Sequence, residues 1–309
     1  MKGTFYLILT GFFLATTGIW VKLIGTSISP FLLTIFRTLI AAALIFAMVV
    51  ISRNMKTVET LKIKKRDALL MLVIAFFGVT IGLGFYVKSF SYVPVANSVM
   101  LVYVYPVIVT LLSWPLLKER ITRWELTALV LILLGIWTIY GSEINIAADV
   151  LGNTFALLAG LGYAVFIVSM RFFEEKGYKY WNVTFWPLLL GGLLLVLLMP
   201  FEPFTFSPSG MMPLYVLGLA MVTFLGYICY AEGLKTVRAL DAVIITALTE
   251  PLSAMVLAFL ILGEAIPQSV LAGGALIIAA NILVSREHRK KRIRRCKEKK
   301  PQECFGWTW

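Results

Sequence analysis

Residues 240–266 read LDAVIITALTEPLSAMVLAFLILGEAI, an apolar run that is long enough to cross a membrane and is interrupted near its middle by Thr249-Glu250-Pro251. A carboxylate at membrane depth is costly unless it faces protein or water, so Glu250 marks a candidate functional site. Pro251 cannot donate a backbone hydrogen bond, and its ring crowds the carbonyl group of Ala247. The run therefore predicts a membrane helix in which a carboxylate and an unpaired backbone acceptor lie about one turn apart.

The composition of the chain is that of an integral membrane protein. Of its 309 residues, 60% are hydrophobic and 14% are charged, whereas a soluble domain carries about 25% charged residues. A membrane-spanning helix needs about 20 apolar residues. The fold predicted from the sequence is all-α, with ten transmembrane helices and no soluble domain: 4–24, 31–51, 68–88, 93–117, 124–141, 151–172, 181–200, 212–234, 240–262 and 267–285.

Lysine and arginine residues gather in alternate loops. One set of loops, together with both termini, holds 25 of these residues, and the other set holds one, Lys88. By the positive-inside rule, both termini are predicted to be cytoplasmic, in a multi-pass protein of the cell (cytoplasmic) membrane. The net charge of +12 is then explained by this topology and by contact of the basic cytoplasmic tail, 286–309, with anionic lipids of the bilayer. No nucleic acid partner is expected.

The chain contains an internal repeat. YPVIVTLLSWPLLKERI at 105–121 aligns with EPLSAMVLAFLILGEAI at 250–266, and the first two predicted helices align with the sixth and seventh. A five-helix unit that is repeated once must enter the membrane from opposite sides. The sequence thus predicts a first five-helix repeat, 1–145, and a second, inverted repeat, 146–285. Inverted repeats are typical of secondary transporters, whose binding site lies near the membrane midplane between the repeats.

In these motifs the chain resembles the EamA-like family of the drug/metabolite transporter superfamily. The resemblance extends to about residue 285 and rests on Pro106 with Leu-Lys-Glu119-Arg, on Glu250-Pro251 with Leu-Gly-Glu264, and on Arg37. The chain departs from the family pattern at Lys118, where a glycine often precedes the glutamate. The resemblance implies a ten-helix exporter of small organic metabolites such as amino acids. It also implies a central cavity lined by helices one, three, four, six, eight and nine.

Glu250 is the central candidate for the substrate site. Helical spacing places Thr246, Glu250 and Ser253 on one stripe of their helix. One interpretation is a carboxylate that binds a substrate ammonium group, or that takes up and releases a proton, with the two hydroxyl groups as neighbours. The alternative is a structural glutamate that hydrogen-bonds to a neighbouring helix. Both interpretations remain open from the sequence.

The opposite wall of the expected cavity is uncharged. The position that matches Glu250 in the first repeat is Tyr105, which shares a helix face with Asn97. Further candidate contacts for the solute are hydroxyl and aromatic side chains on the cavity helices: Thr17, Trp20, Tyr163, Tyr227 and Tyr230. Such stripes are more often packing surfaces than binding sites. A pocket with aromatic walls and few polar groups would suit a small amphipathic solute.

Several residues are candidates for structural or gating roles. Arg37 lies about six residues inside the second helix, where it could reach the membrane surface as an anchor, or contact a substrate carboxylate or a gate. Glu119 and Glu264 are expected to cap the turns that lead into helices five and ten. The remaining candidates are two helix-perturbing prolines and a glycine suited to close helix approach: Pro106, Pro251 and Gly82.

Several motifs are absent from the sequence. The chain has no phosphate-binding G-x-x-x-x-G-K-[ST] loop, and its single histidine, His288, lies in the basic tail. Neither an enzyme nor a cofactor or metal is predicted. The predicted function is secondary transport of a small-molecule solute by alternating access, with proton or cation coupling open, in a monomer or homodimer. The alternatives are efflux of cationic drugs and a non-transporting, lipid-handling or sensory membrane protein.

Overall fold

The computed structural model describes residues 2–51, 61–105, 107–109, 111–112, 122–140, 146–178, 180–208, 210–237 and 239–298. These residues are mostly helical, and within them extended pairing is limited to an isolated bridge between Ile28 and Phe206. Within the described ranges, six helical spans are long and apolar enough to cross a membrane: Lys2–Ser27, Pro30–Ile51, Lys65–Ser89, Val150–Ser169, Tyr180–Phe201 and Met212–Leu234. The all-helical, multi-pass prediction is thus confirmed. The number ten, the inverted repeat and the cytoplasmic termini remain predictions.

The first half of the chain forms helices that several short irregular segments interrupt. Its elements are α1 (Lys2–Ala15), α2 (Thr17–Ile24), η1 (Gly25–Ser27), α3 (Pro30–Ile51), η2 (Lys65–Asp67), α5 (Ala68–Ile74), η3 (Ala75–Leu83), α6 (Gly84–Ser89), α7 (Val95–Val102) and α9 (Arg123–Tyr140). The η3 segment is a π-helix between α5 and α6. Inserted π-helical turns are frequent at functional sites.

The second half has the longer helices. Its elements are α10 (Ile146–Glu175), α11 (Tyr180–Leu194), η4 (Leu195–Phe201), α12 (Met212–Leu234), α13 (Ala239–Leu257), η5 (Ala258–Leu262) and α14 (Gln268–Glu298). α13 continues through Pro251, so the Thr249-Glu250-Pro251 interruption does not end the helix. α14 continues well beyond the predicted helix end at residue 285. Lysine, arginine and glutamate favour helix, which explains why this part of the basic tail is helical.

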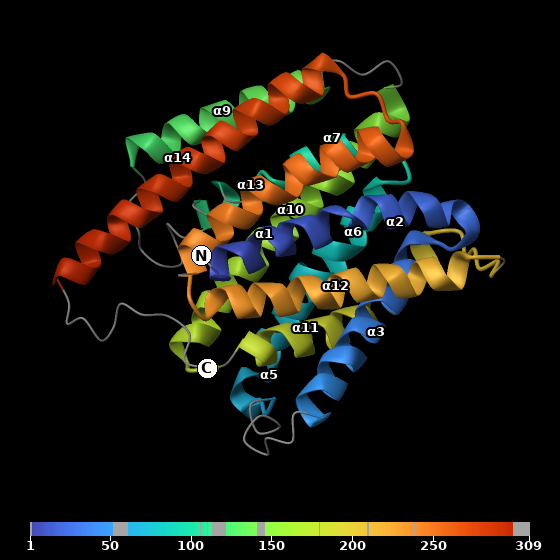
Figure 1. The fold of residues 1–309 in the computed structure, drawn as a ribbon, viewed down its shortest axis with the longest axis horizontal. Helices are drawn as coiled ribbons and strands as arrows, with labels where there is room; N and C mark the ends of the chain where they lie inside the picture. The colour runs from blue at the N-terminus through green and yellow to red at the C-terminus, as the bar shows by residue number, and fades with distance from the viewer. Residues whose placement is uncertain are drawn as a thin grey trace.

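The helices of the two halves are interleaved. α1 packs against α12 and α13, α3 packs against α11 and α12, and both α10 and α11 pack on η3. Figure 1 shows α9 and α14 side by side along one edge, whereas α3 and α5 lie toward the opposite edge. α1, α10, α12 and α13 lie between these edges. Side chains that face the interior therefore come from both halves of the sequence.

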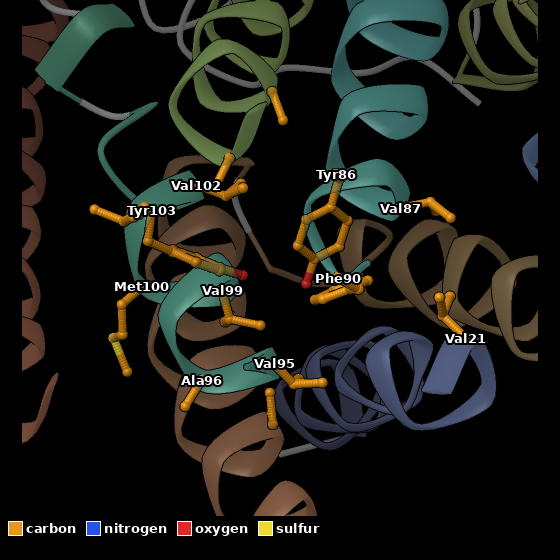
Figure 2. Close-up of a cluster of buried hydrophobic side chains, with 14 of the residues drawn as sticks. Val21, Tyr86, Val87, Phe90, Val95, Ala96, Val99, Met100, Val102 and Tyr103 are labelled. Carbon is orange, nitrogen blue, oxygen red and sulfur yellow. The ribbon is translucent and has the colours of Figure 1, made fainter. Parts of the chain in front are cut away.

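α7 lies at the centre of the largest cluster of buried apolar side chains. All eight of its residues are buried, and Figure 2 shows Val95, Val99 and Met100 on it, near Tyr86 and Phe90 of the preceding segment. Six of its eight residues are apolar, and a helix with apolar side chains around most of its circumference is expected to be buried. α7 is thus a central buried helix, and α10, α13 and α14 pack against it.

The predicted helix 93–117 is not one continuous helix in its described part. α7 ends at Val102, and Tyr103 and Val104 form a turn before helical residues resume at Tyr105 and continue at 107–109. Pro106 lies outside the described residues, but proline supplies no amide hydrogen and its ring disfavours a helical carbonyl four residues earlier, at Val102. At this turn, the side chain of Asn281 on α14 donates a hydrogen bond of 2.9 Å to the backbone carbonyl of Tyr103.

Glycines allow the closest approach between η3 and α10. A Cβ atom added to Gly162 would lie 2.5 Å from the carbonyl oxygen of Phe77 and 2.7 Å from the amide nitrogen of Gly82. Both obstacles are backbone atoms, which cannot rotate away as a side chain can. Gly82 therefore lies at a tight helix crossing, as its small size suggested.

Candidate functional site

Glu250 lies on α13, beside the turn that follows α7. One of its carboxylate oxygens, Oε2, accepts a hydrogen bond of 2.7 Å from the hydroxyl group of Tyr103. Tyr103 is 4% exposed, and the hydrogen bond from Asn281 to its backbone carbonyl helps to fix its place. Glu250 itself is only partly buried. Its carboxylate is thus oriented by one partner while retaining capacity to accept further hydrogen bonds.

Arg37 lies on α3 in the interior of the helix assembly. It is 2% exposed, so it does not reach the surface, and the anchor interpretation does not fit the structure. Its Nε donates a hydrogen bond of 2.7 Å to the Thr223 hydroxyl on α12, and its Nη2 donates one of 3.3 Å to the Thr17 hydroxyl on α2. Its Nη1 is buried and has no hydrogen-bond partner among the described residues.

The two charged groups belong to one cluster. Arg37 lies within electrostatic range of Glu250, although no ion pair joins them in the part of the chain that the structure describes. Both also act on the hydroxyl groups of the same three tyrosines, from α6, α10 and α12: Tyr86, Tyr163 and Tyr227. We call Thr17, Arg37, Tyr86, Tyr103, Tyr163, Thr223, Tyr227 and Glu250 the central polar cluster.

Figure 2 shows how two members of this cluster meet. Tyr86 and Tyr103 extend toward each other from α6 and from the end of α7, and their hydroxyl ends point into the same region. Among the predicted site residues, Tyr105 adjoins the cluster, because its ring centroid lies 5.6 Å from that of Tyr103 and 6.3 Å from that of Tyr163. The cluster is therefore polar at its charged centre and aromatic around it.

The structure also gives the packing, hydrogen bonding or burial of the other predicted contacts. Trp20 packs against Tyr215 on α12 with ring centroids 6.1 Å apart, and Tyr230 packs against Tyr180 on α11 at 5.9 Å. The Thr246 hydroxyl donates a hydrogen bond of 3.1 Å to the carbonyl of Ala242 in its own helix. Asn97 is buried on α7, and Ser253 is half-buried on α13. The structure gives none of these five side chains a hydrogen bond to Glu250.

A buried ion pair that sequence reasoning missed joins the two halves. Lys88 is near the end of α6, and its Nζ lies 2.6 Å from Oε2 of Glu202, the residue that follows η4. The other Glu202 oxygen accepts a hydrogen bond of 2.9 Å from the amide of Phe31, in the first turn of α3. One signal was available, because Lys88 is the single basic residue on the predicted non-cytoplasmic loops. A single lysine on these loops suggests that a carboxylate lies nearby as its counter-charge.

Glu264 forms a second contact of this kind. Its Oε2 accepts a hydrogen bond of 3.0 Å from the amide of Val95, and its Oε1 lies 4.0 Å from Nζ of Lys22. Glu264 therefore binds the first turn of α7, not the turn leading into α14 that the sequence suggested. Burial raises the pKa of the Glu264 carboxyl group, against the opposing effects of Lys22 and of the backbone amides of α7. Glu119 and Pro106 lie outside the described residues.

Two pairs of loops are also tied together. Near Glu202, the amide of Ser29 donates to the carbonyl of Thr205 at 2.9 Å, and the amide of Ser207 donates to the carbonyl of Ser27 at 2.8 Å. In the other pair, Asp67 accepts hydrogen bonds from Lys176 and, at 2.8 Å, from the Tyr178 hydroxyl. Each pair joins a loop from one half of the chain to a loop from the other.

The described residues contain no group of three or more histidine, cysteine, aspartate or glutamate side chains that could hold a metal ion. The charged and hydroxyl groups of the central polar cluster are suited to ionic and hydrogen-bonding recognition. A guanidinium group can bind a carboxylate or phosphate, and a carboxylate can bind an ammonium group or a proton.

The sequence was compared with known families and proteins. The sequence profile of the EamA-like transporter family matches residues 1–141 and 150–286, which confirms the resemblance inferred from the motifs. An uncharacterized transporter of Archaeoglobus fulgidus is 32% identical over 65% of this chain and 71% of its own length. An uncharacterized transporter of Bacillus subtilis is 27% identical over 94% of this chain and 97% of its own. A solved crystal structure shares the fold, with a TM-score of 0.64 and 20% identity over 93% of this chain and 98% of that chain.

Proposed function

Because this chain belongs to the EamA-like transporter family, we propose that it is a secondary transporter that exports small organic metabolites, such as amino acids or related compounds, by alternating access. Its relatives are named only as transporters, so the solute class and the direction are part of this proposal. The protein is a multi-pass membrane protein. We place it in the cytoplasmic membrane, with both termini in the cytoplasm.

The observation that carries the proposal is the central polar cluster. Charged side chains are rare in membrane-spanning helices and usually mark the path of a substrate or ion. Here Arg37 comes from the first half of the chain and Glu250 from the second, which is the arrangement expected of a site between two repeats. We assign substrate binding to this cluster, and we assign to Glu250 the binding of a substrate cation or a coupling proton.

Contacts between the loops support the alternating-access part of the proposal. The Lys88–Glu202 ion pair and the pairing of Ser29 with Thr205 tie the two halves together on the predicted outer face. To release solute outside, these outer contacts must break. The contact between Asp67 and Lys176, on the predicted cytoplasmic face, must remain formed at that stage. Such contacts can close one face at a time because each is local and polar.

The test is solute flux in liposomes that contain the purified full-length chain. Liposomes loaded with a mixture of the twenty standard amino acids should lose one or more of them faster than protein-free liposomes do. Glu250→Gln should slow this flux and change its pH dependence, whereas Glu232→Gln, a matched variant of an exposed carboxylate outside the cluster, should retain both. If no solute crosses faster than in protein-free liposomes, the protein is better explained as a lipid-handling or sensory membrane protein.

Orientation can be tested with native cysteines. Cys296 and Cys304 lie in the basic tail, and Cys229 is buried on α12. In intact cells, a membrane-impermeant maleimide should leave both tail cysteines unlabelled, and labelling should follow once the membrane is permeabilised. The double variant Cys296→Ser/Cys304→Ser should lose that signal. Labelling in intact cells would contradict a cytoplasmic C-terminus.

A further inference from the structure

A strongly basic segment leads into α5, at the end of this helix that is predicted to be cytoplasmic. Residues 61–67 read LKIKKRD, and the side chains of Lys64, Lys65 and Arg66 are all exposed. The acidic residue of this segment, Asp67, has a side chain that is only 1% exposed. The exposed side of the segment therefore carries an excess of positive charge.

Contacts with the second half of the chain hold this basic segment in place. The indole nitrogen of Trp186 donates a hydrogen bond of 2.6 Å to the carbonyl of Leu61. The hydroxyl group of Tyr178 accepts a hydrogen bond of 3.1 Å from the amide of Lys64 and donates one of 2.8 Å to Asp67. A segment that is fixed before a ligand arrives loses less conformational entropy when the ligand binds.

Asp67 does not neutralise the exposed charges. It forms an ion pair with Lys176, from the turn after α10, and it accepts the hydrogen bond from Tyr178. Nε of Arg66 lies 3.8 Å from the Asp67 carboxylate, but the Arg66 side chain is 73% exposed. Because an ion pair this exposed contributes little, the guanidinium group remains available to another anion.

An exposed apolar stripe continues from the basic segment along α5 and into η3. At helical steps of three or four residues, Arg66 is followed by side chains that are 36–73% exposed: Leu69, Leu72, Val73 and Phe76. Figure 1 shows α5 toward the edge of the assembly opposite α9 and α14. From residue 66 to residue 76 the helix rises about 15 Å, which is half of a hydrocarbon core of about 30 Å. The stripe thus has the length of one leaflet and begins at a group of positive charges.

From this arrangement we infer that the basic segment and the apolar stripe form a binding site for an anionic phospholipid. The phosphate of the headgroup accepts charge-assisted hydrogen bonds from Lys64, Lys65 and Arg66. An acyl chain of the same lipid lies along the stripe from Leu69 to Phe76. This site is separate from the basic tail, 286–309, and it does not depend on which solute the protein carries.

The charge of the lipid decides how well it fits. Three basic side chains near a membrane surface favour an anionic lipid by on the order of 100-fold, and at least about tenfold remains if Arg66 is partly engaged by Asp67. Phosphatidylcholine carries a phosphate too, but its choline group would add positive charge beside the lysines. A soluble phosphate lacks the acyl chain that covers the stripe.

The inference is tested with two lipids that differ in charge. The purified full-length chain in detergent is titrated with phosphatidylglycerol or with phosphatidylcholine of the same acyl chains, and bound lipid is counted by native mass spectrometry. The wild-type protein should bind phosphatidylglycerol at least about tenfold more tightly. Lys64→Gln/Lys65→Gln/Arg66→Gln should lose most of this preference and should bind phosphatidylcholine as the wild type does.

A matched control removes the same charge elsewhere. Lys2, Arg123 and Arg286 are also exposed basic residues at the predicted cytoplasmic ends of helices. Lys2→Gln/Arg123→Gln/Arg286→Gln therefore has the same net charge as the first triple variant, and it should keep the preference for phosphatidylglycerol. Leu69→Ala/Leu72→Ala reduces the apolar stripe and should weaken the binding of both lipids by a similar factor.

Three results would overturn the inference. If phosphatidylcholine binds as tightly as phosphatidylglycerol, charge has no role in the site. If both triple variants lose the preference equally, only a general attraction between a basic protein and an anionic lipid remains. If glycerol 3-phosphate displaces phosphatidylglycerol at the concentrations at which the lipid binds, the ligand is a free phosphate and not a lipid.

The wild-type protein alone provides a test that does not depend on the folding of any variant. Raising the ionic strength from about 0.15 M to about 1 M shortens the screening length from about 8 Å to about 3 Å. Binding of phosphatidylglycerol should therefore weaken, whereas binding of phosphatidylcholine should not change. An unchanged affinity for phosphatidylglycerol would contradict a site that selects its lipid by charge.

Discussion

Removing Lys88 should destabilise the protein by leaving Glu202 buried without its counter-charge. The Glu202 side chain is 0% exposed, that of Lys88 is 11% exposed, and the two charged groups lie 2.6 Å apart. In Lys88→Met, the amide of Phe31 remains the partner of one Glu202 oxygen, and the methionine can still pack near the Phe31 ring, over which Nζ of Lys88 now lies at 5.4 Å. The expected loss is therefore mainly electrostatic.

The size of the effect follows from burial. Breaking a buried ion pair by removing one partner costs about 3–5 kcal/mol, whereas replacing both partners with neutral groups is often close to neutral. Lys88→Met should thus lower stability by about 3–5 kcal/mol. Lys88→Met/Glu202→Gln should be less destabilised than Lys88→Met, because no isolated charge remains and the glutamine can still accept from Phe31.

The assay is thermal unfolding of the purified chain in detergent, followed by tryptophan fluorescence. A loss of this size should lower Tm by on the order of 10 °C, at roughly 2–4 °C per kcal/mol. The control is Lys235→Met, which breaks the exposed pair of Lys235 with Glu232 and should change stability by less than about 1 kcal/mol. The single variant Glu202→Gln completes the comparison. If the loss of stability in the double variant equals the sum of the losses in Lys88→Met and Glu202→Gln, the two charges are not coupled and the reasoning fails.

Three further predictions concern the rest of the fold. Because the folded-state pKa of Glu264 is raised, its contribution to stability is present below the ordinary value of 4.5 and is lost as pH rises through the raised value. The Tm of the wild type should therefore fall relative to that of Glu264→Gln across this range, and parallel profiles of Tm against pH would contradict the assignment. Gly162→Ala should cost about 1–3 kcal/mol because its Cβ would meet backbone, whereas in the control Gly226→Ala the nearest atoms, at 3.0 and 3.2 Å, belong to the flexible side chain of Leu14. Tyr178→Phe removes a hydroxyl that donates to Asp67 and accepts from the amide of Lys64, so it should lower stability by about 1–3 kcal/mol, with Tyr215→Phe as the control for loss of a tyrosine hydroxyl.

The sequence predicts the helices better than their contacts. The predicted starts and ends of the helices around 31–51, 212–234 and 240–262 agree with α3, α12 and the α13–η5 segment, because long apolar runs and positively charged loops are local properties. The division of the predicted helix 93–117 after Val102 and the π-helix of η3 depend on how neighbours pack, so periodicity alone did not reveal them. The positions of Tyr103 and Thr223 beside the two charges also result from tertiary packing.

The repeat explains why the two charges of the central polar cluster have no counterparts of their own kind. The alignment that matches Glu250 with Tyr105 also matches Arg37 with Trp186, since Phe36 aligns with Phe185. Tyr105 adjoins the cluster as an aromatic wall, and Trp186 donates a hydrogen bond of 2.6 Å to the carbonyl of Leu61, in the segment that precedes η2. In each helix pair, one copy provides a charge and the other an aromatic side chain with packing and hydrogen-bonding roles. The two halves thus differ at the two positions that supply the charges of the central polar cluster, and each half supplies one of these charges.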